Sequence, residues 1–184
     1  YAETADILSE SLVHVDTGMN RLGLTRKELD AHMTDGFDGL HPLALMSHLA
    51  CAEMDHPLNE AQRTSFAEML SVFRTKFPDA KASFANSSGI FLDPAYHYDY
   101  ARPGVALYGV NPTPDRPNPM LPVVRLSARI VQVRRVDRAS TVGYGATAAV
   151  PEGAKLATAS IGYADGLPRA WGAGGHGFVD GIRC

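Results

Sequence analysis

The stretch from 83 to 111 carries the residue types that can hold an anion. Asn86–Ser88 offers an amide and two hydroxyls next to a glycine, and Arg102 follows directly before Pro103 and Gly104. Hydroxyls and free backbone N–H groups at the start of a helix can bind a phosphate, and a guanidinium adds a planar charge. An ordinary strand with polar turns has a similar composition, so the spacing alone leaves both interpretations open.

A second candidate is Arg21, which follows Asp16 in a glycine-containing turn at the end of an expected strand. Arginine in such a loop commonly clamps a carboxylate, because its planar fork matches two oxygens. A solvated loop arginine is the alternative. His14 shares a strand face with Asp16, but no third ligand accompanies this pair, and we predict no metal site.

The elements that must position these residues alternate between strand and helix. We expect strands over 11–15, 43–49, 80–86 and 101–110, helices over 1–8, 59–77 and 87–92, and a short helix that opens at Thr25. Thr25 and Glu28 have the spacing of a capping box, and Asn59 is the predicted N-cap of the next helix. Repeated strand–helix units predict parallel strands whose carboxyl ends share one edge of a sheet. His48, Asn86 and Arg102 all lie at or beside such ends.

The chain changes character after residue 110. The segment 111–122 is rich in prolines, which neither a helix nor a central strand tolerates, and it predicts a domain linker. Beyond it we expect a bulged antiparallel strand over 123–136 with its slip near Ile130, a turn at Gly143–Gly145, a strand over 155–161 and a loose glycine-rich connection over 172–177. The second domain is therefore predicted to be all β.

Composition limits the class of partner. The 184 residues are 45% hydrophobic and carry a formal charge of −3, which is ordinary for a soluble protein and gives no reason to expect nucleic acid or an anionic membrane as partner. Cys51 and Cys184 are the only cysteines, and no apolar run approaches the length of a membrane span. We expect a small-molecule ligand and a cytoplasmic location.

Six blocks occur in a specific order along nearly the whole chain: Asp16–Gly23, Ser47–Ala50, Ala85–Ser87, Arg102–Val105, Gly143–Thr147 and Ile161–Gly166. In this order the sequence resembles the alanine racemases. The resemblance implies an α/β fold, namely the C-terminal part of a (β/α)8 TIM barrel followed by an incomplete all-β domain. It predicts a partial barrel that binds pyridoxal 5'-phosphate over 1–114 and the start of the C-terminal β domain over 115–184.

The resemblance also assigns cofactor contacts. Ser87 with the backbone N–H groups of Gly104 and Val105 is similar to the family's phosphate cradle, with Asn86 beside it. Arg102 resembles the arginine that donates to the pyridine nitrogen of the cofactor. Because a guanidinium does not readily yield its proton, the ring is a weaker electron sink, which suits racemisation better than transamination.

Further residues resemble the family's catalytic and substrate-binding groups. Tyr144 matches the tyrosine that handles the proton on one face of the substrate and that comes from the other subunit of a homodimer, with His48 as its neighbour. A phenol is a weak base near neutrality and needs nearby positive charge or hydrogen-bond donors. Arg21 is similar to the carboxylate-binding arginine, and Tyr163 and Arg169 resemble members of the substrate entry corridor.

The chain departs from the family pattern at three points. His14 stands where many relatives carry a lysine, often carbamylated, that orients the arginine at 21, and Ser83 stands where many carry histidine. The Schiff-base lysine has no counterpart, because none of the lysines, Lys27, Lys76, Lys81 and Lys155, lies in the family's context. We therefore expect a fragment that lacks the N-terminal lysine segment and the C-terminal end and is inactive by itself.

The resulting functional prediction is interconversion of L- and D-alanine by the full-length protein, either to supply D-alanine for the cell wall or to use it catabolically. Two alternatives remain open. One is a racemase of broader specificity that uses the same machinery, and the other is a catalytically dead module that binds the cofactor or a partner.

Overall fold

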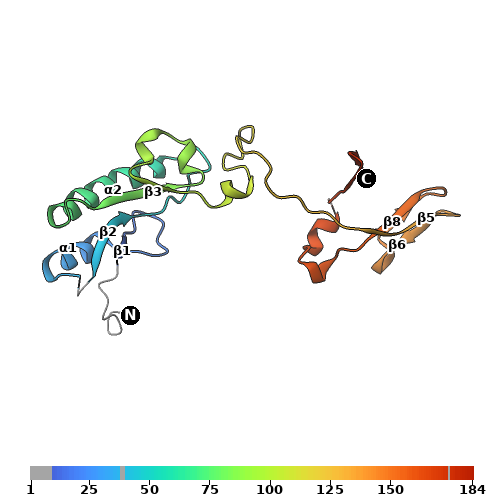
Figure 1. Ribbon diagram of the computed structural model, residues 1–184, viewed down its shortest axis with the longest axis horizontal. Helices are drawn as coiled ribbons and strands as arrows, with labels where there is room; N and C mark the ends of the chain where they lie inside the picture. The colour runs from blue at the N-terminus through green and yellow to red at the C-terminus, as the bar shows by residue number, and fades with distance from the viewer. Residues whose placement is uncertain (1–9, 38–39, 174) are drawn as a thin grey trace. The chain divides into compact units, whose positions relative to one another are not determined.

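The computed structural model describes residues 10–37, 40–173 and 175–184, which belong to two compact units, Tyr1–Val124 and Arg125–Cys184 (Figure 1). The helix expected over 1–8 lies outside the described residues. Each unit is described by itself below.

The first unit contains a four-stranded parallel sheet. Its strands are β1 (Glu10–His14), β2 (His41–Met46), β3 (Lys81–Asn86) and β4 (Tyr100–Arg102), and they pair in the order of the sequence. All three pairings are parallel, which confirms the expectation from the alternating pattern. The carboxyl ends of the strands therefore lie along one edge. Within the described residues the sheet is open, and closure into a barrel is not seen.

Two helices connect the first three strands. Helix α1 (Arg26–Asp35) begins with the predicted capping box: the Thr25 hydroxyl accepts from the Glu28 N–H, and the Glu28 carboxylate accepts from the Thr25 N–H. Helix α2 (Pro57–Lys76) begins earlier than predicted. Its N-cap is His56, whose Nδ1 accepts from Leu58 N–H, because Pro57 suits the first helical position and needs no partner for a missing N–H. The prediction of Asn59 as N-cap was wrong.

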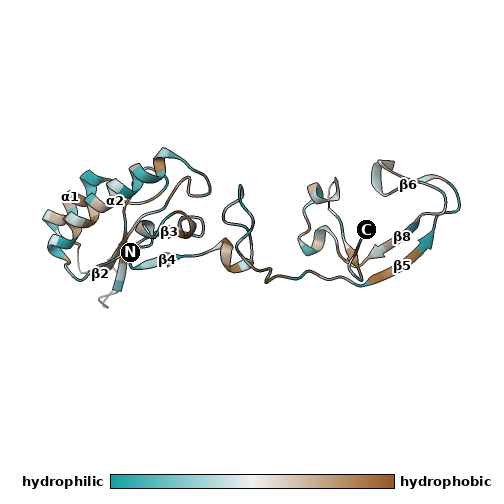
Figure 2. Ribbon diagram, turned by 90° about the horizontal axis from the view of Figure 1, so that it is seen from above, coloured by the Kyte–Doolittle hydropathy of each residue, from teal (hydrophilic) through white to brown (hydrophobic). Residues whose placement is uncertain are grey.

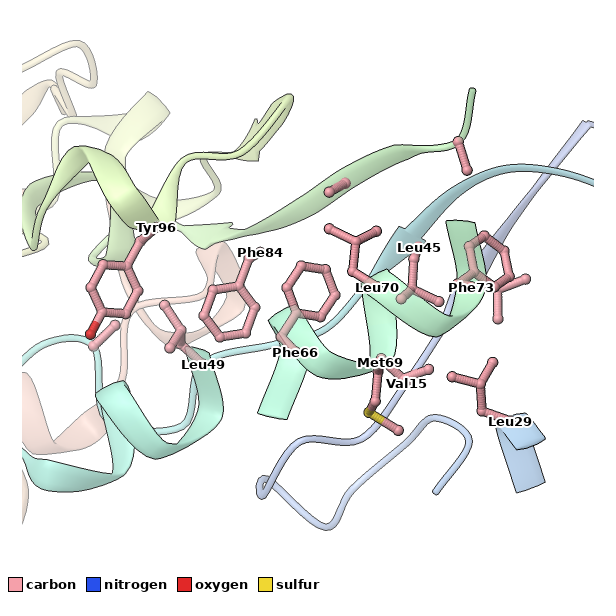
Figure 3. Close-up of a cluster of buried hydrophobic side chains, with 14 residues drawn as sticks. Val15, Leu29, Leu45, Leu49, Phe66, Met69, Leu70, Phe73, Phe84 and Tyr96 are labelled. Atoms are coloured by element: carbon pink, nitrogen blue, oxygen red, sulfur yellow. The ribbon is translucent and has the colours of Figure 1, made fainter. Parts of the chain in front are cut away.

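The core lies between the sheet and the buried face of α2. Phe66 of α2 stacks on Phe84 of β3 with ring centroids 4.8 Å apart (Figure 3). The ring centroids of Phe73 and Phe77 are also 4.8 Å apart. Hydrophobic and hydrophilic residues are mixed along both helices, as expected of helices with one buried face (Figure 2). This packing fixes the strands whose ends carry the candidate site.

The strand expected over 101–110 was wrong beyond its first residues. Strand β4 ends at Arg102, and Val105–Tyr108 form a 3₁₀ helix. Pro103 has no N–H for a sheet, and the N–H groups of Gly104 and Ala106 donate to the side chain of Ser87 instead of to a neighbouring strand. The helix expected over 87–92 is likewise only a 3₁₀ turn at Gly89–Phe91.

The second unit consists of antiparallel ribbons. They are formed by β5 (Ile130–Arg135) with β8 (Lys155–Ala159), β6 (Ser140–Val142) with β7 (Ala148–Val150), and β9 (Phe178–Val179) with β10 (Ile182–Arg183). The predicted bulge is confirmed, because the register of β5 shifts between Ile130 and Gln132. The strand begins later than expected, and residues 123–129 are irregular.

Candidate active site

The polar residues predicted for the site gather at the carboxyl edge of the parallel sheet. His48 follows β2, Ser87 follows β3, Arg102 ends β4, and the loop that contains Arg21 follows β1. This edge is where open parallel sheets and barrels carry their ligands.

The guanidinium of Arg102 connects three of these elements. Its Nη1 donates to Ser83 Oγ at 2.6 Å, and its Nη2 donates to the carbonyl of Ser47 and lies 3.4 Å from His48 Nδ1. Ser83 Oγ in turn donates to Tyr100 O at 2.9 Å, so the serine is a well-fixed acceptor. Burial lowers the pKa of Arg102, which nevertheless remains a cation near neutrality. These contacts hold the arginine in one orientation.

Two histidines lie in the field of this arginine. Burial first, and then the positive charge of Arg102, lower the pKa of His48 below its usual 6.5; Arg21 and His14 act in the same direction. The pKa of His14 is lowered by burial and Arg102 as well, against the opposing charge of Asp16. Both imidazoles are therefore neutral at pH 7 and can accept a hydrogen bond or a proton.

The Ser87 hydroxyl is the centre of a small cradle of N–H donors. Ser87 is buried, and its Oγ accepts from Gly104 N–H at 2.8 Å and from Ala106 N–H at 3.3 Å. A Cβ at Gly104 would lie in the open space in front of this hydroxyl, with Ser87 Oγ at 4.0 Å as its nearest contact. Val105, between the two donors, has a half-exposed side chain. Hydroxyl and backbone N–H groups are the donor types that bind a phosphate, and here the N–H groups of Gly104 and Ala106 point at the same hydroxyl.

The side chain of Asn86 hydrogen-bonds to backbone groups beside this cradle. Its Oδ1 accepts from Gly89 N–H at 2.9 Å, and its Nδ2 donates to Leu49 O at 3.4 Å. The side chain thus joins the end of β3 to the loop after β2.

The loop after β1 is shaped by Asp16. Its Oδ1 accepts the N–H groups of three successive residues, Gly18, Met19 and Asn20, at 2.9 to 3.1 Å. Burial raises the pKa of Asp16, but these donors together outweigh that effect and leave the pKa below its usual range. Arg21 follows at the exposed rim of this turn.

The remaining predicted residues belong to the second unit. Tyr144 lies at the start of a 3₁₀ turn, Tyr144–Ala146, in which Gly145 has a φ of 73°, and its side chain is fully exposed. Tyr163 lines a pocket of about 560 Å³ together with Leu167, Pro168 and Trp171. Arg169 begins the following 3₁₀ helix. The relation of these side chains to Arg102 stays a prediction.

Within residues 10–37, 40–173 and 175–184, no group of three or more His, Cys, Asp or Glu side chains is arranged to hold a metal ion. In the same described part of the chain, no helix is long and apolar enough to cross a membrane.

Both units of the chain match domains of a known protein family. Residues 6–112 match the alanine racemase N-terminal domain, and residues 123–184 match the alanine racemase C-terminal domain. The chain belongs to the alanine racemase family. The parallel α/β unit and the β unit described above correspond to these two matches.

Similar proteins within the family include an alanine racemase of Rhodospirillum rubrum, 52% identical over 172 residues, and a catabolic alanine racemase of Mesorhizobium japonicum, 52% identical over 160 residues. These alignments cover 92% and 85% of this chain but 45% and 41% of the two relatives. The chain thus spans less than half the length of these curated relatives.

Solved structures of the family are also similar. Alanine racemase from Streptomyces coelicolor A3(2) matches 99% of this chain and 51% of its own with a TM-score of 0.89 and 31% identity. Alanine racemase from Bartonella henselae, solved with covalently bound pyridoxal phosphate, matches 92% of this chain and 47% of its own with a TM-score of 0.77 and 38% identity.

The sequence alone did not single out Gln62, a polar residue beside the candidate active site of this chain. Gln62 of α2 is fully buried and hydrogen-bonds to both the β1 and the β2 loop. A signal was present: Gln62 lies one helical turn before Phe66, on the face that otherwise carries Phe66, Met69 and Phe73. A glutamine on an apolar face is a buried polar group that requires partners.

Proposed function

We propose that this chain is part of a pyridoxal-phosphate-dependent racemase that interconverts L- and D-alanine. The observation that carries the proposal is Arg102, a half-buried guanidinium fixed by Ser47 and Ser83 and next to the hydroxyl and N–H cradle of the neighbouring strand end. The names of the family relatives support the same reaction, and both catabolic and biosynthetic alanine racemases are among them.

The cradle fits a phosphate group. Ser87 Oγ and the N–H groups of Gly104 and Val105 would hold the phosphate of the cofactor, with Asn86 keeping the loops beside it in position. Bound pyridoxal phosphate supplies an electron-withdrawing ring that acidifies the Cα proton of an amino acid.

Arg102 would donate to the ring nitrogen. Its contacts with Ser83 and Ser47 use part of the guanidinium and fix the direction of the rest. A guanidinium donates a hydrogen bond without giving up its proton. Arg102 would therefore limit how much negative charge the ring takes up. The charge that stays at Cα would favour return of a proton there.

Proton transfer and substrate orientation fall to other residues. Tyr144, supplied by the second subunit of a homodimer, would take or return the proton on one face of Cα, with neutral His48 as its neighbour. Arg21 would bind the substrate carboxylate with its planar fork. Tyr163 and Arg169 would line the route of entry.

The proposal concerns the complete protein. It includes the assignment of residues 1–114 to a (β/α)8 barrel and of residues 115–184 to the C-terminal β domain, in a cytoplasmic enzyme. Of the lysines in the first unit, Lys76 at the end of α2 and Lys81 at the start of β3 lie at the opposite, amino-terminal edge of the sheet. The lysine that anchors the cofactor in the family has no counterpart in this sequence.

The test is racemisation of alanine by the complete protein and its Tyr144→Phe variant. Removing the phenolic hydroxyl should lower the rate in at least one direction by about 10²–10⁴-fold, the usual contribution of a general acid or base. Tyr108→Phe, which removes an exposed hydroxyl of the first unit, is the matched control and should leave the rate unchanged.

Undiminished racemisation by Tyr144→Phe in both directions would disprove the assignment of the tyrosine. Comparable turnover of serine or a basic amino acid would indicate the racemase of broader specificity. No turnover of any amino acid by the wild-type protein would indicate a module without activity.

A further inference from the structure

A buried glutamine joins the two loops that carry the candidate active site. Gln62 of α2 has no exposed surface, and its amide faces the carboxyl edge of the sheet. Its Oε1 accepts from Ala50 N–H at 2.9 Å, and its Nε2 donates to His48 O at 2.9 Å and to Thr17 Oγ1 at 3.2 Å. All the polar atoms of the side chain are therefore paired.

The orientation of this amide follows from its partners. Ala50 offers an N–H, which only a carbonyl oxygen can accept, and His48 offers a carbonyl, which only an NH₂ group can satisfy. Turning the amide around would place donor against donor and acceptor against acceptor. The loop after β2 is thus gripped at two points by one side chain in one orientation.

The same amide reaches the loop after β1. Thr17 Oγ1, which accepts from Gln62, lies 2.8 Å from Ser47 Oγ, and a Cβ added at Gly18 would lie 3.4 Å from Gln62 Cγ. This loop leads to Arg21. Ser47, whose hydroxyl lies next to Thr17, precedes His48 in the chain, and its carbonyl accepts from the guanidinium of Arg102.

We propose that Gln62 is a positioning residue of the site, whose amide holds the loops after β1 and β2 together and so sets the place of His48 against Arg102. The effect of Gln62 on catalysis rests on the proposed racemase function. Its effect on the position of His48 does not depend on that function. Gln62 touches neither the phosphate cradle nor the guanidinium itself and acts through the backbone of residues 47–50.

Asn59 provides the comparison that separates positioning from core packing. It lies one turn earlier on α2, it is buried as well, and its Nδ2 donates to the carbonyls of Cys51 and Met54 at 3.2 and 3.0 Å. It therefore grips the far end of the same loop with the same chemistry, without contacting His48 or Thr17. Simple stabilisation of the loop would make the two amides equivalent.

The experiment measures the pKa of His48 by NMR in the complete protein, with Cε1-labelled histidine and a His48→Gln variant to assign the signal. Gln62→Met keeps the length of the side chain and removes its hydrogen bonds; Asn59→Leu is the matched control. Arg102, Arg21 and His14 are the charged and titratable groups that face His48, and all three lower its pKa.

Gln62→Met should raise the pKa of His48 toward its usual value, because the imidazole gains water and moves away from Arg102. Asn59→Leu should leave that pKa in place. An unchanged His48 in Gln62→Met, or an equal shift in both variants, would overturn the proposal.

Activity supplies a second and separable readout. In the racemase assay Gln62→Met should lower kcat by about 10-fold to 100-fold, as misplacement of a group by about an ångström does, with less effect on KM, and Asn59→Leu should not. If the wild-type protein does not racemise, the proposed function fails, while the His48 titration still decides the role of Gln62. If Gln62→Met does not fold, Thr17→Val takes its place. A smaller rise in the pKa of His48 is then expected, and an unchanged pKa would contradict the proposal.

Discussion

The two units of the chain bury their apolar side chains to very different degrees. In the first, one continuous core runs from β1 through both helices to β3, and Val15, Phe66, Phe73 and Phe84 have no exposed surface. Among the described residues of the second unit, Val136 is the only buried hydrophobic side chain. On β5, Val131 and Val133 remain 63% and 61% exposed.

The difference follows from architecture. A parallel sheet with helices on it buries side chains within one unit, and the hydrophobic effect then stabilises each strand by about 25 cal/mol per Å² of apolar area removed from water. A two-stranded ribbon has nothing on its faces and is at best marginally stable in water. The first unit is therefore held by its own packing, whereas the exposed apolar residues of β5 contribute little burial to the second unit.

The largest expected effect tests this difference directly. Phe73→Ala in the first unit should cost about 3–5 kcal/mol of unfolding free energy, because it empties a fully buried site between Phe37 and Phe77. Val133→Ala in the second unit should change stability by less than about 0.5 kcal/mol. Urea unfolding of the complete protein measures both.

Two spectroscopic signals separate the units in that measurement. Among the 184 residues, the described α-helices both lie in the first unit, and Trp171, the one tryptophan of these residues, lies in the second. Within this part of the protein, helix circular dichroism therefore reports on the first unit and the fluorescence of Trp171 on the second. A cost for Val133→Ala as large as that for Phe73→Ala would break the comparison, since it would mean that β5 is packed in a core of the complete protein.

Glycines give a second, smaller contrast. Gly23 has a φ of +118°, and a Cβ there would lie 2.7 Å from Val15 C and 2.8 Å from Asp16 N. This overlap in Gly23→Ala should lower the free energy of unfolding by about 1–3 kcal/mol beyond the backbone strain. Gly153 has a φ of +80° with open space around it, and Gly153→Ala should show the strain alone, about 1 kcal/mol. Equal costs, measured by thermal unfolding, would show that the loop after β1 yields to the added methyl.

The smallest expected effect is a dependence of the first unit on pH. Because the folded pKa values of His14 and His48 lie below 6.5, the unfolded chain binds more protons between those values and 6.5. This contribution to stability is complete above 6.5 and is lost as the pH falls through that window. Helix unfolding in urea at about pH 7.5 and about pH 5.5 should show the loss, and a His14→Asn, His48→Asn double variant should reduce it. If the double variant lost as much stability at low pH as the wild-type protein, groups other than these two histidines would cause the loss.

Local signals in the sequence were the reliable ones. The capping box of Thr25 and Glu28 was predicted and confirmed, because both partners lie within one helical turn. The slip in β5 was also confirmed, since two adjacent β-branched residues break the alternation in the sequence itself. The predicted strand after Arg102 was wrong because Ser87, far away in the sequence, takes the N–H groups that a sheet would need.

The candidate site divides in the same way. The order of blocks identified the family and named Arg102, His48 and Ser87 as its residues. It did not reveal that Ser83 accepts from Arg102, or that Gln62 binds the loops that carry Arg21 and His48. The roles of Tyr144, Tyr163 and Arg169 remain predictions for experiments on the complete protein.

By itself, the sequence determined the alternation of strands and helices, the parallel sheet, the shared edge of strand ends and the family, because periodicity, capping and motif order are properties of neighbouring residues. Only the tertiary structure decided which partners each polar side chain meets. The pairing of the strands brings Arg102 to Ser47, and the packing of α2 on the sheet brings Gln62 to Thr17. A buried polar atom must find its partner wherever the tertiary structure places one.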